Sequence, residues 1–463
     1  MRTRIAATAL ALVALVAVTA GQPQPVDLIV HNAIVVTMNA AGRVLPRGAV
    51  AIRGNQIVAV ESADAIASAF SARETIDAGG QIVMPGFVNT HGHAPMVLYR
   101  GLADDLALME WLQKYIFPAE AKTVSPEFVR AGTRLAVLEM IQSGTTTYTD
   151  MYYFEEEIAR VTREAGLRGV LGQTIIQFPV ADAKTPAEGL ARTETFLEAF
   201  AGDELITPAL APHAMYTLDA ATLRAVRAMA DRHQAPVLIH LAETADESQT
   251  SQKQHKVSPT RYLESLGFWG PRTLAAHAIW LDEADIGILA KRKVGVSHNP
   301  ESNMKLASGT AKIPALRKAG VSAGLGTDGA ASNNDLDMFE AMRQAAFLHK
   351  LTSNDPRTLP AREVLAMATI EGARALGMDD RIGSLEAGKR ADLILVSMAG
   401  ARQTPMYDPI SHLVYVARGG DVRTTIVNGK ILMRDRKMLT LNEAEVIREA
   451  HEYAQKVREA VGK

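Results

Sequence analysis

The chain has 463 residues, of which 48% are hydrophobic and 22% are charged, and its formal net charge is −2. This length suits one large α/β domain with an accessory domain, or two or three ordinary domains. The near balance of charge does not favour nucleic acid as a partner, and the lack of cysteine excludes disulfides, cysteine-type zinc sites and a thiol nucleophile.

The first residues have the pattern of an export signal. Arg2 and Arg4 form a short basic start, and the apolar run over residues 5–20 ends in small residues. This run is shorter than the roughly 20 residues that span a bilayer as a helix. We therefore predict a signal peptide over residues 1–20, a periplasmic or secreted protein, and no stable membrane anchor after cleavage. An uncleaved anchor is the alternative.

β-rich segments at the two ends of the chain predict one small domain. Asp27–Val36 is followed by residues 48–60, where a Gly-Asn dipeptide between two β-branched runs indicates a hairpin. A similar pair returns at Ala391–Val396 and at residues 423–432, again with a turn dipeptide. We predict a discontinuous β-sandwich domain from residues 21–84 and 380–440, and a charged amphipathic helix over residues 441–463.

The middle of the chain alternates between strand-length apolar runs and helical patterns. Helical patterns cover Glu127–Gln142, Leu218–His233, Glu283–Arg292 and Ile313–Ala319. Eight strands alternating with helices predict an α/β fold of the (β/α)₈ TIM barrel type over residues 85–379. The eight apolar runs are Phe87–His91, Thr145–Asp150, Gly169–Ile176, Ile206–His213, Pro236–His240, Thr273–His277, Val294–His298 and Val321–Asp328.

Histidines gather at the ends of these runs. The carboxyl ends of barrel strands open on one face, where the active sites of such barrels lie. A single histidine at such a place is more often a packing or capping residue than a ligand, but six at equivalent positions are hard to explain by packing. The six, among 12 histidines in the chain, are His91, His93, His213, His240, His277 and His298.

Four residues at these ends can converge on one divalent ion. His91 and His93 follow the first strand, His240 ends the fifth, and Asp328 follows the eighth. Three imidazoles and a carboxylate suit Zn²⁺, although Fe²⁺, Ni²⁺ and Co²⁺ also bind imidazole-rich sites. A metal there would lower the pKa of a bound water to about 7 and so supply hydroxide at neutral pH.

The chain also carries sequence motifs that resemble the amidohydrolase superfamily, and within it the 5′-methylthioadenosine and S-adenosylhomocysteine deaminases of the chlorohydrolase branch. The resemblance spans nearly the whole chain after the apolar leader. The motifs that carry it are MPGFVNTHGH (Met84–His93), GLADDLALMEWL (Gly101–Leu112), IHLAET (Ile239–Thr244), AAHAIWL (Ala275–Leu281), SHNPESNMKLASG (Ser297–Gly309), LGTDGAASNNDLDMFEAMR (Leu325–Arg343) and IGSLEAGKRADLILV (Ile382–Val396).

The resemblance implies a role for each polar residue. The four residues above match the ligands of a single metal ion, because Thr207–Tyr216 lacks the lysine that binuclear relatives carry. Glu243 matches the residue that carries protons and contacts the substrate ring, and His277 matches the histidine that orients the attacking hydroxide. Asp328 would also accept the proton that the bound water releases.

The substrate-binding residues follow in the same way. Glu110 matches a carboxylate that holds ribose hydroxyls, and His213 matches a histidine that faces the substrate. Some relatives carry an arginine after the third strand for a charged substrate tail, but Leu171–Pro186 contains Gln173 and Gln177 and no arginine. Methylthioadenosine and adenosine therefore remain open as substrates beside S-adenosylhomocysteine.

We therefore expect a zinc-dependent hydrolytic deaminase of adenosine-type nucleosides, in which metal-bound hydroxide displaces ammonia. A guanine-type or cytosine-type deaminase and an s-triazine hydrolase are alternatives with the same metal site. A barrel scaffold without catalysis is a further alternative, because the fold alone does not determine function. The expected partner is a small molecule and not nucleic acid, and homo-oligomers remain open.

Overall fold

Eight parallel strands close into a barrel, which confirms the predicted fold. The structure is a computed structural model that describes residues 22–462, so the predicted signal peptide lies outside the described residues. The strands pair in the order β10-β11-β12-β13-β6-β7-β8-β9, in which the contact between β13 and β6 joins the last barrel strand to the first. They are β6 (Phe87–Asn89), β7 (Thr145–Tyr152), β8 (Arg168–Ile175), β9 (Ile206–Pro212), β10 (Val237–Leu241), β11 (Thr273–His277), β12 (Gly295–His298) and β13 (Ala323–Leu325).

Helices follow the barrel strands. The first long one, α4 (Pro126–Ser143), begins after Ser125, whose side chain accepts the N–H of Phe128 at 3.2 Å. It ends at Gly144, which has φ of +92° and so supplies the left-handed residue that commonly ends a helix. The other long helices of this region are α5 (Glu155–Ala165), α6 (Pro186–Ala199), α7 (Ala220–His233), α8 (Ala245–His255), α10 (Glu283–Arg292) and α13 (Met338–Ser353).

Shorter elements occupy the loops of the barrel, and several of them lie at its carboxyl end. They are η1 (Ala94–Tyr99), α2 (Leu108–Trp111), η2 (Leu112–Ile116), α3 (Phe117–Thr123), η3 (Met215–Thr217), α9 (Pro259–Ser265), α11 (Pro300–Lys305), α12 (Ile313–Lys318), α14 (Ala361–Met367) and α15 (Ile370–Ala375). The segment from η1 to α3 joins β6 to α4, and it contains several residues of the cavity described below.

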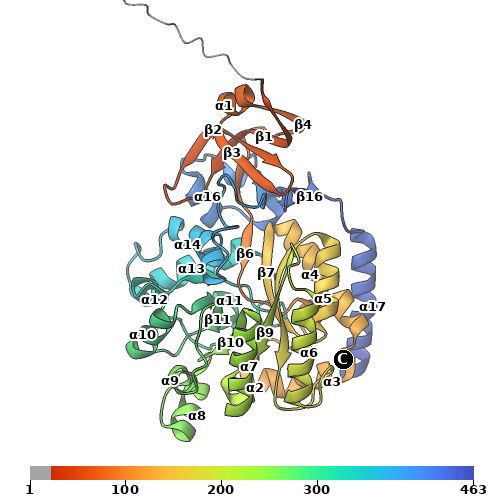
Figure 1. The fold of residues 1–463 in the computed structure, drawn as a ribbon, viewed down its shortest axis with the longest axis vertical. Helices are drawn as coiled ribbons and strands as arrows, with labels where there is room; N and C mark the ends of the chain where they lie inside the picture. The colour runs from red at the N-terminus through yellow and green to blue at the C-terminus, as the bar shows by residue number, and fades with distance from the viewer. Residues whose placement is uncertain (1–21, 463) are drawn as a thin grey trace, which may run out of the picture.

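A second sheet of nine strands is built from both ends of the chain and lies at one end of the barrel (Figure 1). The antiparallel pairing of β14 with β5, in which Ile394 faces Met84, joins the C-terminal strands to the N-terminal ones. This arrangement is consistent with the predicted β-sandwich. The strands are β1 (Gln24–Val36), β2 (Val44–Arg53), β3 (Gln56–Ser62), β4 (Phe70–Asp77), β5 (Ile82–Pro85), β14 (Leu393–Val396), β15 (Val422–Val427), β16 (Lys430–Arg434) and β17 (Lys437–Met438), with helix α1 (Ala63–Ala69) between β3 and β4.

A buried ion pair joins this sheet to the barrel. Arg168 is the first residue of β8, and its guanidinium lies 3.0 Å from the carboxylate of Asp392, which precedes β14. The Asp392 carboxylate also accepts the backbone N–H of Asn428 at 2.6 Å. The second sheet therefore covers the amino ends of the barrel strands, and the carboxyl ends stay available for a functional site.

The C-terminal helix α17 (Glu443–Val461) packs on the barrel against α3 and α4. The guanidinium of Arg134 lies 3.0 Å from Glu449, and the rings of Phe128 and Tyr453 are 5.9 Å apart. The remaining elements before it are η4 (Ala401–Gln403), α16 (Pro409–Tyr415) and η5 (Gly419–Asp421). Among residues 22–462, none of the helices has both the length and the apolar character needed to span a membrane.

Candidate metal and active site

Side-chain hydrogen bonds hold the ends of β6 and β13 together. Asn89 donates from Nδ2 to Oγ1 of Thr327 at 2.8 Å, and Oδ1 of Asn89 accepts the N–H of Thr327 at 3.1 Å. The N–H of Asp328 then donates to the carbonyl of His91 at 3.0 Å. His91 and Asp328 are 237 positions apart in sequence, and this closure of the barrel brings them together.

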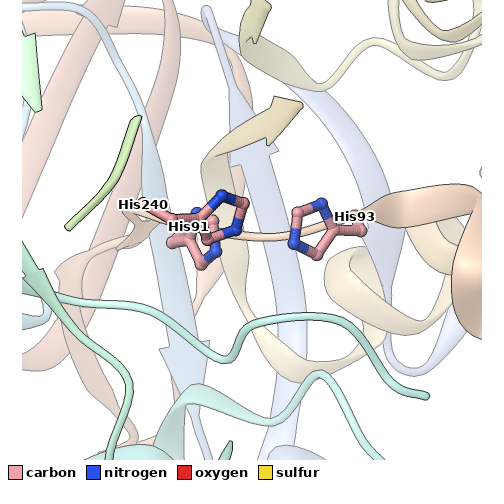
Figure 2. A group of neighbouring side chains, drawn as sticks. All are labelled: His91, His93 and His240. Carbon is pink, nitrogen blue, oxygen red and sulfur yellow. The ribbon is translucent and has the colours of Figure 1, made fainter. Parts of the chain in front are cut away.

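Three imidazoles meet at the carboxyl ends of β6 and β10 (Figure 2). The ring of His91 lies 4.9 Å from that of His93 and 5.0 Å from that of His240. Nδ1 of His93 lies 2.8 Å from the carbonyl of Met151, and Nδ1 of His240 lies 2.8 Å from the carbonyl of His213. Because a carbonyl only accepts, each Nδ1 carries a proton, so Nε2 is the ring nitrogen through which each imidazole would bind a metal ion.

The donor atoms at this place fit a divalent cation. Nε2 of His91 is buried and has no hydrogen-bond partner, as expected of an atom that needs a ligand. Oδ1 of Asp328 lies 3.4 Å from Nε2 of His91 and 3.3 Å from Nε2 of His93. Burial lowers the pKa of His91 to about 4, so its imidazole is in the neutral form that binds metals. The structure thus brings together the four residues that the sequence proposed as ligands, and three imidazoles with one carboxylate suit zinc.

Glu243 and His277 lie beside this group. Nε2 of His277 is 3.9 Å from Oε2 of Glu243 and 3.9 Å from Oδ2 of Asp328. Nδ1 of His277 lies 2.9 Å from Oδ1 of Asn303, so Nε2 is the ring nitrogen that faces the two carboxylates. Burial raises the pKa of Glu243, and a carboxyl whose pKa lies nearer neutrality is a better proton carrier.

A cavity opens over these residues. Its polar floor includes His93, His240, Glu243, His277 and Asp328. His213 also reaches the cavity, as predicted from its place after β9, and burial lowers its pKa to about 3, so the ring is neutral. Apolar side chains from the segment between β6 and α4 form one wall, and these are Met96, Leu108, Trp111, Leu112, Ile116 and Phe117.

The structure does not bring Glu110 into the cavity. This carboxylate was expected to hold ribose hydroxyls, but its side chain is 43% exposed and pairs with Lys114 at 2.8 Å on the outside of the same segment. A glutamate and a lysine four positions apart on a helix commonly form such a surface pair. The spacing of Glu110 and Lys114 was therefore a sequence signal for an exposed position.

On this segment the carboxylate that does face the cavity is Glu120, which was not predicted from the sequence. Glu120 lines the cavity, is 7% exposed, and accepts a hydrogen bond of 2.6 Å from the hydroxyl of Tyr152. Burial raises its pKa to about 7. One signal was present in the sequence, because Glu120 follows Ile116 by four positions and Phe117 by three, which places it on the apolar face of the same helical segment.

Neither of the two glutamines of the predicted segment Leu171–Pro186 lines the cavity. Gln173 is buried and donates from Nε2 to the carboxylate of Asp182 at 2.9 Å, and Gln177 is exposed. The cavity has no arginine among the described residues that line it. The cavity therefore offers no guanidinium to a charged substrate tail.

Comparison with known proteins gives a consistent assignment. Residues 82–432 match the amidohydrolase family. The chain is 47% identical over 432 residues to the 5-methylthioadenosine/S-adenosylhomocysteine deaminase of Syntrophobacter fumaroxidans. The aligned residues cover 93% of this chain and 98% of the relative. It is 46% identical over 438 residues to the 5′-deoxyadenosine deaminase of Methanosarcina barkeri, and the aligned residues cover 93% of this chain and 98% of that relative.

A solved structure agrees with these relatives. The zinc-bound structure of an adenosine deaminase from Xanthomonas campestris superimposes with a TM-score of 0.93 at 41% identity, covering 94% of this chain and all of that one. The barrel, the convergent histidines and the sequence similarity along the chain lead to one conclusion. This chain belongs to the amidohydrolase family.

Proposed function

We propose that this protein is a zinc-dependent deaminase of adenosine-type nucleosides, which converts a 6-aminopurine nucleoside and water into the 6-oxo nucleoside and ammonia. One observation carries the proposal. His93, His240, Asp328, Glu243 and His277 form the floor of a cavity whose wall contains a further buried carboxylate, Glu120. The three relatives named above are nucleoside deaminases, and their names support the same substrate class.

His91, His93, His240 and Asp328 would hold the zinc ion. A zinc ion supplies Lewis acidity and lowers the pKa of water at neutral pH. Asp328 accepts one proton of the attacking water, and Glu243 gives a proton to the ring nitrogen next to the amine-bearing carbon as the oxygen adds to that carbon. Glu243 then moves the remaining proton of the added hydroxyl to the amine, which leaves as ammonia, and the proton on Asp328 returns to Glu243. His277, with its free Nε2 between Glu243 and Asp328, orients the attacking oxygen.

The cavity walls indicate how the rest of the nucleoside would bind. A carboxylate accepts hydrogen bonds from both hydroxyls of a ribose, and Glu120 supplies one from the wall of the cavity. The apolar wall suits the base and a neutral 5′ substituent such as a methylthio group. We therefore expect 5′-methylthioadenosine, 5′-deoxyadenosine and adenosine to be better substrates than S-adenosylhomocysteine.

Ammonia release tests the proposal. Zinc-loaded protein would be assayed against these four nucleosides together with guanine, cytosine and an aminotriazine, with Glu243→Gln as the inactive control. Release from the nucleosides alone supports the proposal. Ammonia release only from a free base or the triazine would show that the substrate is not a nucleoside. No ammonia release from any compound by the zinc-loaded protein would favour the alternative of a barrel scaffold without catalysis.

We also propose that the protein works outside the cytoplasm, because its N-terminal sequence has the composition of a signal peptide. Fractionation of cells that produce the full chain, with mass determination of the mature N-terminus, tests this. A mature protein that starts after residue 20 in the exported fraction supports the proposal. An intact N-terminus in the cytoplasmic fraction would contradict it.

A further inference from the structure

Glu243 lies on a short turn that belongs to no strand or helix. Strand β10 ends at Leu241, and helix α8 begins at Ala245 after its N-cap residue Thr244. Between them Ala242 has φ of +48°, a left-handed conformation that a residue other than glycine adopts only when its surroundings hold it. The position of the Glu243 carboxylate therefore depends on what fixes the backbone of Ala242 and Glu243.

A single buried carboxylate, that of Glu247, binds the amide side of this turn. Oε1 of Glu247 accepts the N–H of Ala242 at 3.0 Å, and Oε2 accepts the N–H of Glu243 at 3.0 Å. Glu247 is 6% exposed, so water does not replace these bonds. Two consecutive amides and the two oxygens of one buried carboxyl group thus form a fork.

Ordinary helix capping does not account for these contacts. Glu247 is the third residue of α8, and its own N–H donates to Oγ1 of Thr244 at 3.2 Å. In a capping box the carboxylate at this position would return to the N–H of the N-cap residue itself. Here it bonds instead to the two residues before Thr244, and one of these is Glu243.

The carbonyl side of the same turn is bound to the loop that directly follows His277. The carbonyl of Leu241 accepts the N–H of Ala278 at 2.9 Å. The carbonyl of Ala242 accepts the N–H of Ile279 at 3.2 Å and that of Trp280 at 3.0 Å. The turn is thus held from both sides, and the contact of 3.9 Å between Glu243 and His277 depends on both.

We propose that Glu247 is a positioning residue for the reaction, which acts by holding the backbone of Glu243 so that its carboxylate faces His277 and the metal ligands. This inference rests on the proposed function, because it takes Glu243 as the proton carrier. Glu247 itself does not touch the substrate, since it is absent from the residues that line the cavity.

Glu247→Gln is a sharp test because it changes one acceptor into a donor at nearly constant volume. The amide NH₂ then meets a backbone N–H, so one bond of the fork is lost while the helix is kept. Asp246→Asn is the matched control, because Asp246 is an exposed acidic residue in the same first turn of α8. Glu247→Asp keeps both acceptor oxygens on a shorter side chain.

The measurement is kcat per bound zinc ion, with KM and zinc content for each variant. Glu247→Gln should lower kcat by about 10- to 100-fold, the usual range for an outer residue that orients an inner one. The KM and the zinc content of Glu247→Gln should stay at wild-type values. The kcat of Asp246→Asn should match that of the wild type, and the kcat of Glu247→Asp should lie between those of the wild type and Glu247→Gln. A wild-type kcat per zinc in Glu247→Gln would overturn the proposal, even if that variant were less stable.

A second measurement does not depend on the reaction. Hydrogen exchange of the peptide over residues 241–246, followed by mass spectrometry, should be faster in Glu247→Gln at the amides of Ala242 and Glu243 and unchanged in Asp246→Asn. Unchanged exchange would overturn the proposal. If the wild-type chain deaminates none of the nucleosides, the proposed function fails, and this exchange result still decides whether Glu247 holds the turn.

Discussion

The hydroxyl of Tyr152 donates a hydrogen bond of 2.6 Å to Oε1 of Glu120, and both side chains are buried in the wall of the cavity that contains Glu243. Tyr152 is the last residue of β7 and Glu120 lies on α3, so the barrel and its first long connection meet at this bond. The bond leaves Oε2 of Glu120 for a ligand and fixes the direction in which it points.

The first prediction concerns substrate binding by Glu120. Glu120→Gln replaces the charged acceptor by an amide and should lower kcat/KM for adenosine-type nucleosides by about 10- to 100-fold, mainly through KM, because hydrogen bonds to a charged group contribute about 1.5–3 kcal/mol. Steady-state kinetics with adenosine measures this. Glu110→Gln makes the same change at an exposed position and should stay near wild type. A large effect of Glu110→Gln with none of Glu120→Gln would contradict our placement of the ribose-binding carboxylate.

The second prediction concerns the pH dependence of stability. Burial raises the pKa of Glu120 to about 7 in the folded protein, whereas the ordinary value is 4.5. The folded state therefore binds more protons in this window, and the contribution of Glu120 to the free energy of unfolding falls as the pH rises from about 4.5 to about 7 and is constant above it. Across this pH range the free energy of unfolding loses on the order of 3 kcal/mol from this one group.

Glu120→Gln cannot ionise and escapes this loss. The melting temperature of Glu120→Gln minus that of the wild type should therefore be more positive at pH 8 than at pH 5. Scanning calorimetry of both proteins at the two pH values measures the difference, with Glu110→Gln as the control. A difference that does not change with pH would show that Glu120 titrates normally in the folded protein.

The third prediction concerns the metal. His240→Ala removes one of the three convergent imidazoles and should reduce the zinc content well below one ion per chain, with loss of activity. Metal analysis after dialysis measures the content, and unfolding with and without added zinc measures the stabilisation that binding to the folded state provides. His213→Asn is the control, since His213 faces the cavity but is outside the metal-binding group. It should keep its zinc while its activity falls.

The fourth prediction concerns the junction between the barrel and the second sheet. Asp392→Asn leaves the guanidinium of Arg168 buried without its charged partner, and both side chains are only 3% exposed. Breaking a buried pair in this way costs about 3–5 kcal/mol. Glu61→Gln breaks the exposed pair of Glu61 with Arg43 and should cost less than about 1 kcal/mol. Urea unfolding of the two variants compares them, and equal losses would contradict a structural role for the Arg168 pair.

Much of the fold could be read from local patterns. The predicted runs Thr273–His277 and Glu283–Arg292 coincide with β11 and α10. The hairpins at the Gly54-Asn55 and Asn428-Gly429 dipeptides are both present. These elements were predictable because their hydrophobic period and turn residues are short-range properties of the chain.

Other elements were less visible in the sequence. Strand β4 was not predicted, because five of its eight residues are exposed and its hydrophobic pattern is weak. The predicted strand beginning at Val321 is shorter in the structure, where β13 covers Ala323–Leu325. Neither difference moves a proposed ligand, since the residues at the carboxyl end of each strand keep their place.

The sequence by itself determined the barrel, the second sheet from both chain ends and the residue types at the carboxyl ends of the strands, because strand period and histidine spacing are local. Only the tertiary structure decided which carboxylates face the cavity. Glu110 and Glu120 lie ten positions apart on one helical segment, and the way this segment packs over the barrel exposes the first and buries the second. The fork from Glu247 to the Glu243 turn was likewise invisible in the sequence, because it depends on the backbone conformation of Ala242 and on the burial of Glu247.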